Sequence, residues 1–124
     1  MSISSLFKGR IRPGYYFGGF VFMHVVVWVL SLIMNASGEG MFGTLIALVG
    51  IIVYLPIMIG LMVRRLHDMN KSGWYILLSL VPLMNILFGF WILFSSGDKE
   101  ANEFGPAPTH KTFFQALLNL EQKV

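Results

Sequence analysis

The sequence predicts an all-α membrane protein with three transmembrane helices, a short cytoplasmic basic loop and an amphipathic C-terminal segment. Apolar residues make up 56% of its 124 residues and charged residues only 12%, whereas soluble proteins carry about 25% charged residues. The apolar residues are concentrated in three runs without Asp, Glu, Lys or Arg. A soluble core cannot hide that much apolar surface, so we expect one polytopic membrane domain over residues 1–124.

The three runs cover residues 15–34, 41–63 and 74–96. A helix needs about 20 residues to cross about 30 Å of hydrocarbon, and each run reaches that length. The runs do not alternate between apolar and polar residues as barrel strands do, and helices satisfy their own backbone groups in lipid. The first run has a basic start like a signal peptide, but it is longer than the apolar region of most such peptides and further spans follow it. We therefore expect three spanning helices.

The distribution of lysine and arginine predicts the orientation of these helices, because cytoplasmic segments carry the excess of both residues. The loop at residues 35–40 contains Glu39 and no basic residue. The segment before the first run and the loop at residues 64–73 contain six basic residues between them: Lys8, Arg10, Arg12, Arg64, Arg65 and Lys71. We therefore expect the N-terminus and the 64–73 loop in the cytoplasm, and the tail, residues 97–124, outside.

The third run leaves an alternative open, because Pro82 and Asn85 lie near its middle. A proline kink is ordinary in a packed membrane helix. The same residues are also compatible with a re-entrant hairpin, which would return the tail to the cytoplasm.

The tail divides into two parts by composition. Residues 97–108 are rich in glycine, proline and charge, which predicts a loop. Residues 109–124 resemble a short amphipathic helix, and we favour an interfacial helix lying on the bilayer over a frayed terminus. Its apolar side chains fall mostly on one face: Phe113, Phe114, Leu117, Leu118 and Leu120.

Two polar residues lie inside the predicted spans, His24 in the first and Asn85 in the third. An ionisable group at membrane depth suggests a function such as proton or ion relay. The structural alternative is a neutral imidazole that is hydrogen-bonded within the bundle, with Asn85 as its candidate partner. Small residues also mark helix contacts, within the bundle or with a second copy: Gly14, Gly18, Gly43, Ala47 and Gly50.

The 64–73 loop is the densest cluster of charge in the chain. Its arginines suit an anionic ligand or a lipid headgroup. We expect Asp68 to pair with one basic group from Arg10, Arg64 or Arg65. A metal site is not expected, because His67 and Asp68 are too few ligands and His110 belongs to the tail on the opposite side. The candidate polar or headgroup site consists of Arg10, Arg64, Arg65, His67 and Asp68.

The sequence of the 64–73 loop and of two other segments resembles that of a known family. The order Arg64-Arg65-Leu66-His67-Asp68 followed by Ser72-Gly73-Trp74 resembles the signature of a bacterial inner-membrane family catalogued as domain of unknown function 805. Two further segments are similar to the family's opening and close: Gly9-Arg10 with Tyr15-Tyr16, and Gly97 with Asn102-Glu103-Phe104-Gly105 and Pro108. The resemblance implies a small multi-pass protein of the bacterial cytoplasmic membrane. It implies no reaction, since the role of the family is not established.

The chain departs from the family pattern at two places. Pro13 stands where the family often has a second arginine, which here is Arg12. Asp68-Met69-Asn70 stands where the family commonly has a turn such as Asp-Thr-Gly. Neither difference removes the resemblance.

We consider three functions. The first, which we favour, is a non-enzymatic membrane protein that acts through helix contacts and a basic cytoplasmic face. The second is a small oligomeric carrier or channel that uses His24 and Asn85. The third is an enzyme that acts on a lipid headgroup through His67 and Asp68. The expected partners are membrane lipids and either a second copy or another membrane protein. With no cysteine and basic residues at membrane edges, we expect no thiolate site, no cofactor and no nucleic acid.

Overall fold

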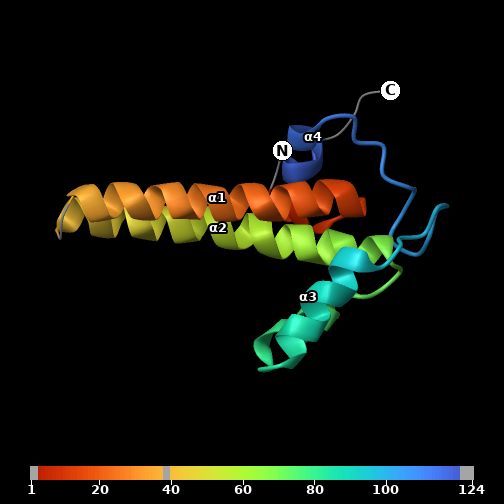
Figure 1. Cartoon of the computed structure of the whole chain (residues 1–124). Coiled ribbons are helices and arrows are strands. Elements are labelled where there is room, and N and C mark those ends of the chain that lie inside the picture. Colours follow the sequence, from red (N-terminus) through yellow and green to blue (C-terminus); the bar gives the residue numbers. More distant parts are fainter. Residues whose placement is uncertain (1–2, 38–39, 121–124) are drawn as a thin grey trace.

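The computed structural model describes residues 3–37 and 40–120 as a set of helices joined by short loops (Figure 1). Within these residues the extended pairing is a single bridge between Asn102 and Gly105. The elements in chain order are the 3-10 helix η1 (Ile3–Phe7), α1 (Pro13–Ser37), α2 (Met41–Asp68), the 3-10 helix η2 (Gly73–Leu80), α3 (Met84–Phe94) and α4 (Phe113–Leu118).

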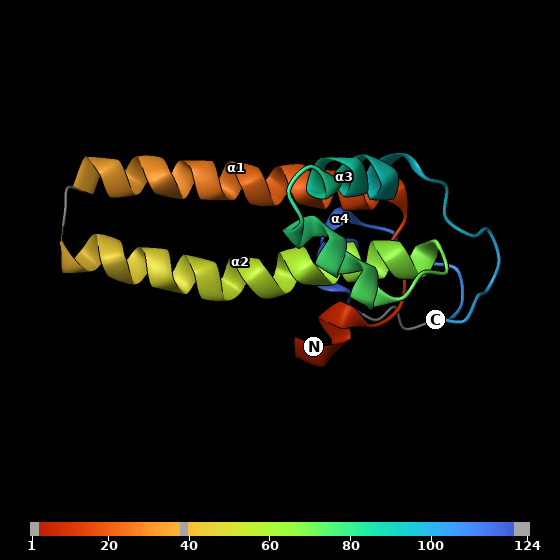
Figure 2. The ribbon, with the colours of Figure 1, turned by 90° about the horizontal axis from the view of Figure 1, so that it is seen from below.

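Helices α1 and α2 form one long antiparallel hairpin (Figures 1 and 2). They contain 25 and 28 residues, which correspond to about 37 and 42 Å at 1.5 Å per residue. Both helices are long and apolar enough to cross a membrane. Helix α2 extends beyond the predicted second span, because it continues past Val63 through Asp68 before the chain turns.

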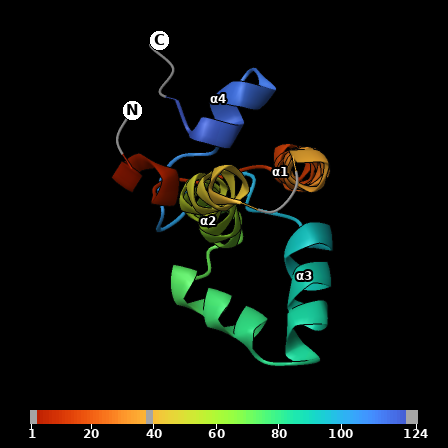
Figure 3. The ribbon, with the colours of Figure 1, turned by 90° about the vertical axis from the view of Figure 1, so that its left-hand side faces the viewer.

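The third apolar run is not the continuous spanning helix that we expected. It divides into η2 and α3, which form a V beside α2 (Figure 3). Proline has no N–H and disfavours the helical conformation of the residue before it, and Val81, before Pro82, is accordingly extended. Leu83 then adopts a φ of 69° and reverses the chain. The hairpin corresponds to the re-entrant alternative, and α3, with 11 residues, is too short to span.

The start of the tail lies at the same end of the α1–α2 hairpin as the N-terminal segment. The Asp98 amide donates to the Asp68 carbonyl at 2.7 Å, and α4 packs on α1 (Figure 1). The expectation that the tail lies across the membrane from the 64–73 loop is therefore wrong, because the broken third run brings the chain back. Helix α4 is also shorter than predicted, ending where Asn119 turns left-handed. Residues 121–124 of the predicted amphipathic helix, and Glu39 of the first loop, lie outside the described residues.

The buried core is confined to the end of the hairpin where α2 finishes. The side chains of that core come from α1, α2, α3, α4 and the segment before α1: Ile11, Tyr16, Met23, Met58, Leu61, Leu66, Phe88, Ile92, Ala116 and Leu117. Tyr16, in the first turn of α1, belongs to this core. Toward the other end, most side chains of α1 and α2 are exposed and apolar, as expected of surfaces that lipid covers.

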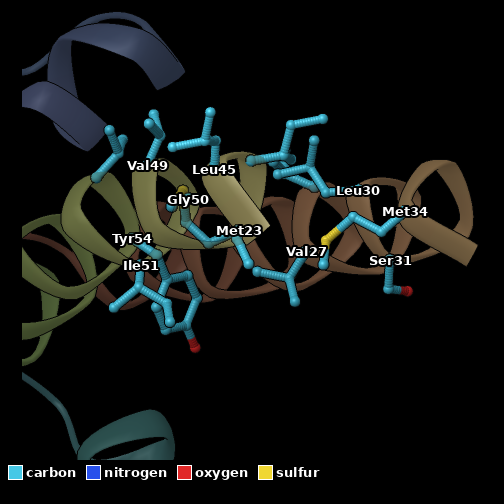
Figure 4. Close-up of a pocket in the computed structure, with 14 residues that line it drawn as sticks. Met23, Val27, Leu30, Ser31, Met34, Leu45, Val49, Gly50, Ile51 and Tyr54 are labelled. Atoms are coloured by element: carbon cyan, nitrogen blue, oxygen red, sulfur yellow. The ribbon is translucent and has the colours of Figure 1, made fainter. Parts of the chain in front are cut away.

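A groove of about 740 Å³ separates the outer halves of α1 and α2 (Figure 4). Its lining is apolar apart from Ser31 and Tyr54. Gly50 lies in the groove, where a Cβ atom would stand 3.8 Å from Leu30, an ordinary contact.

Close packing at the core end depends on Gly60 of α2. A Cβ atom on Gly60 would stand 2.5 Å from the carbonyl oxygen of Leu6 in η1, and backbone cannot move as a side chain can. We expect Gly60→Ala to displace η1 and lower the free energy of unfolding in detergent micelles by about 1–3 kcal/mol.

Gly50→Ala is the matched control for this prediction, because it adds the same methyl group to α2 where there is room. Gly50→Ala is expected to leave the unfolding free energy nearly unchanged. Alanine forms helices better than glycine, so an equal loss in the two variants would show that the added methyl group itself, rather than the η1 contact, lowers the stability.

Candidate functional site: a buried arginine–aspartate cluster

The polar residues of the core end meet in one place, which we call the base. The base comprises the N-terminal arm (residues 3–12), the end of α2 with its loop (residues 64–73) and residues 95–120, which include the described part of the tail. Four of its charged residues are buried among apolar neighbours: Arg10, Arg64, Arg65 and Asp68.

The Asp68 carboxylate is the centre of the base and is fully buried. Arg10 Nε lies 3.0 Å from Asp68 Oδ1, and Arg65 Nη1 lies 2.8 Å from Oδ2. A third arginine, Arg12, lies 3.6 Å from Oδ1 and is partly exposed. The expectation that Asp68 pairs with a basic group is confirmed for Arg10 and Arg65. Each carboxylate oxygen thus has a charged donor, which a buried ion pair requires to offset its desolvation.

Arg65 also holds the end of α3. Its Nε donates to the carbonyl of Ile92 at 2.9 Å, and its Nη2 donates to the carbonyl of Ser95. The last carbonyls of a helix lack partners within the helix, and they form the negative end of its dipole. Each of the three guanidinium nitrogens of Arg65 thus donates to a protein acceptor, two to carbonyls at the end of α3 and one to Asp68.

Arg64 holds the end of α4 in the same way. Its Nη1 and Nη2 donate to the carbonyls of Ala116 and Leu117 at 2.6 and 2.9 Å. Within the described residues Arg64 has no ion pair, so carbonyl oxygens alone balance its buried charge. The sequence suggested a membrane-edge arginine that binds lipid phosphate, but the structure places this side chain in the interior.

Arg10 fixes the loop that follows α3. Its Nη1 donates to the carbonyls of Glu100 and Gly105 at 2.7 and 3.2 Å, and its Nη2 donates to that of Asp98. Arg12 donates to the same Asp98 carbonyl at 2.9 Å. One side chain before α1 thus organises backbone nearly a hundred residues later.

Gly97 permits the close approach of this loop to Asp68. A Cβ atom on Gly97 would overlap the Asp68 carboxylate. Any side chain at this position would therefore push the tail away from the ion pairs.

His67 joins the arm to the tail. Its Nδ1 lies 3.0 Å from the carbonyl of Gly9, and its ring stacks on Phe104 with centroids 4.1 Å apart. Asn102 Nδ2 donates to the His67 carbonyl at 2.9 Å. His67 is half-buried by these contacts, which are those of a packed side chain.

Asn119 ties α4 to the arm. Its Nδ2 donates to the carbonyls of Ser5 and Lys8, so its Oδ1 is left to accept from His110 Nε2 at 3.0 Å. This arrangement requires His110 to carry its proton on Nε2. His110 belongs to the base, whereas the sequence suggested that it lay across the membrane.

The two intramembrane polar residues are not brought together. His24 Nδ1 lies 2.8 Å from the carbonyl of Phe20, and Nε2 lies 3.4 Å from the hydroxyl of Tyr54. Both ring nitrogens therefore have partners other than Asn85, which lies exposed at the start of α3. The expected His24–Asn85 pair is wrong, because the break in the third run places Asn85 in a separate hairpin.

The chemistry open to the base is limited by its pairing. Both oxygens of the buried Asp68 carboxylate already accept from guanidinium groups, so neither is within reach of the proton of a substrate. Among the described residues no three His, Asp or Glu side chains gather as metal ligands. The arrangement is therefore best suited to joining segments.

A family model described as "Protein of unknown function (DUF805)" matches residues 5–106. The chain belongs to this family. "Inner membrane protein YhaH" of Escherichia coli strain K12 is 33% identical over 108 residues, covering 82% of this chain and 86% of that protein. The protein of the same name from E. coli O157:H7 matches to the same extent. No solved structure matches.

The opening, central and closing segments that carry the family resemblance each contribute a residue to the base. Arg10 from the opening, Asp68 from the centre and Gly97 from the close meet at the buried carboxylate. The sequence identified these segments but not their contacts. It missed the roles of Arg12, Asn119 and the tail carbonyls, because backbone acceptors leave no mark in the side-chain pattern.

Asp68→Asn in the DUF805 chain keeps the side-chain shape but removes the charge between two arginines. Uncompensated buried charges are costly, so we expect the free energy of unfolding in micelles to fall by about 3–5 kcal/mol. Asp98→Asn is the matched control, because the Asp98 side chain is exposed and accepts only from Asn102 among the hydrogen bonds shown. The control is expected to lose less than about 1 kcal/mol. Similar losses in both variants would contradict the central role of Asp68.

His110 makes the stability of the base sensitive to acid. Burial, and then the nearby Arg64 charge, lower the pKa of His110 below its ordinary value of 6.5, although the Asn119 hydrogen bond opposes them. The unfolded chain therefore takes up the proton first as pH falls. The resulting stability is fully present above pH 6.5 and is lost as pH falls from there toward the lowered pKa.

We expect the melting temperature to fall between about pH 7.5 and about pH 5.5, and to fall less in His110→Gln, which retains a donor for Asn119. Circular dichroism melts in micelles at both pH values measure the difference. The same pH dependence in the variant would assign the effect to other groups.

Proposed function

We propose that this DUF805 protein is a non-enzymatic, multi-pass protein of the bacterial inner membrane. In this proposal α1 and α2 span the bilayer, the η2–α3 hairpin enters and leaves from the cytoplasmic side, and the base lies in the cytoplasm. The protein acts through helix contacts and the basic face of the base, where lipids or a partner protein dock. The name of the E. coli relative supports the location.

The Asp68 cluster is the observation that carries the proposal. It joins the arm, the end of α2 and the tail on one side of the apolar hairpin. All lysines and arginines of residues 3–37 and 40–120 therefore belong to segments of the base: Lys8, Arg10, Arg12, Arg64, Arg65, Lys71, Lys99 and Lys111. Cytoplasmic segments carry this excess, so the rule assigns both the arm and the tail to the cytoplasm.

The outer surface of the base suits a membrane with anionic lipids. Lys8, Lys71, Lys99 and Lys111 are exposed, whereas the buried arginines are occupied by protein groups. Trp74, with 77% of its surface exposed, begins η2 beside this face, as aromatic residues do at headgroup level. Lipid phosphates are therefore expected at the surface lysines and not at the Arg64–Asp68 cluster.

The contacts of His24 favour the structural role over the carrier or channel. A proton relay needs a chain of exchanging groups, and His24 is instead held between Phe20 and Tyr54 in one tautomer. The headgroup enzyme is disfavoured by the pairing of Asp68 with Arg10 and Arg65. Among residues 3–37 and 40–120, no contact supports either alternative.

Cysteine labelling tests the orientation, since the chain has no cysteine of its own. Lys99→Cys in the tail and Met41→Cys at the start of α2 are both at exposed positions. A membrane-impermeant maleimide added to spheroplasts is expected to label Met41→Cys at once and Lys99→Cys only after the membrane is permeabilised. Labelling of Lys99→Cys in intact spheroplasts would overturn the cytoplasmic base.

A further inference from the structure

The tip of the η2–α3 hairpin, Val81–Leu87, projects from the rest of the protein (Figure 3). Every residue of the tip is exposed. The tip is apolar except for Asn85, which lies in the first turn of α3. Leu83, a bulky residue, is held at a φ of 69° at the bend, a conformation that such residues rarely adopt. The backbone of the tip is thus held in a sharp bend, and the side chain of Asn85 is the polar group on its surface.

The proposed re-entrant insertion places this amide deep in the bilayer. The hairpin begins at the exposed Trp74, and its two legs are joined near that end by an edge-to-face contact of Tyr75 with Trp91. The eight residues of η2 extend about 16 Å at 2.0 Å per residue. That length reaches about the middle of a hydrocarbon layer of about 30 Å, where neither water nor headgroups are at hand.

Asn85 differs from the other polar residues of the apolar segments. Ser31 donates to Trp28, Ser79 donates to Ile76, and His24 pairs with Tyr54. These groups are satisfied near their own positions. The Asn85 side chain makes no hydrogen bond to the part of the chain that the structure describes, although an amide offers two donors and an acceptor oxygen.

We propose that Asn85 pairs with Asn85 of a second copy of this chain, so that two re-entrant hairpins meet tip to tip within the bilayer. The inference rests on the proposed function, since only a membrane-inserted amide lacks water. An amide is both donor and acceptor, so two identical amides complement each other across a twofold axis. Side-chain hydrogen bonds of this kind stabilise helix association in membranes.

Oxidative cross-linking in native membranes tests the pairing. Ile86→Cys places a thiol beside Asn85 in a chain without other cysteines and is expected to give a disulfide-linked dimer. Adding Asn85→Leu is expected to weaken dimerisation about tenfold. Asn85→Gln, which keeps the amide, is expected to preserve most of the dimer. Ser79→Ala is the control, because the Ser79 hydroxyl is already bonded within η2.

Two readouts separate failure of the pairing from failure of the proposed function. Rapid labelling of Ile86→Cys by a membrane-impermeant maleimide would show that the tip lies in water, which overturns both. A protected thiol with no cross-link, or with a cross-link that Asn85→Leu leaves unchanged, would overturn the pairing alone. Protection together with a cross-link that depends on the amide is the result expected.

Discussion

A carboxylate buried in an apolar environment must be surrounded by donors, and at Asp68 this requirement organises the base. The two oxygens take charge-assisted bonds from Arg10 in the arm and from Arg65 in the last turn of α2. The arginines then need acceptors for their remaining N–H groups, because an unpaired buried donor is costly. Backbone carbonyls of α3 and of the segment that follows it supply them. The polar groups therefore form the interior of the base, although the protein is otherwise apolar.

Arg64 and Arg65 show how two neighbouring residues can serve two different helices. Successive side chains on a helix point about 100° apart, so one guanidinium reaches the end of α4 and the other the end of α3. Both helices are short, and short isolated helices are marginal in water. Their ends are fixed by donors from α2, so their positions depend on α2 as much as on their own apolar contacts.

The sequence predicted those features that depend on local pattern. Long uncharged runs predicted α1 and α2, and the density of charge predicted that Asp68 would find a basic partner. The topology predicted from the third run was wrong. The length of the run suggested one spanning helix, but Pro82 divides the run into η2 and α3. The side of the membrane on which the tail lies was predicted from the number of spanning helices. Because the third run does not form a spanning helix, that prediction changes to the opposite side. The pairing of His24 with Tyr54 and the hold of Arg64 on α4 depend on how α1, α2 and α4 pack, which no local pattern shows.

The arrangement of the base also bears on how the protein is made. Arg10 emerges from the ribosome early, but its acceptors at Asp98, Glu100 and Gly105 are among the later residues to be synthesised. The contact of Asp68 with the loop after α3 likewise forms only after Gly97 has been synthesised. The α1–α2 hairpin can therefore enter the bilayer well before the base closes. Until then Arg10 lacks its acceptors in the tail, and in the proposed topology its positive charge favours retention of the arm on the cytoplasmic side during insertion.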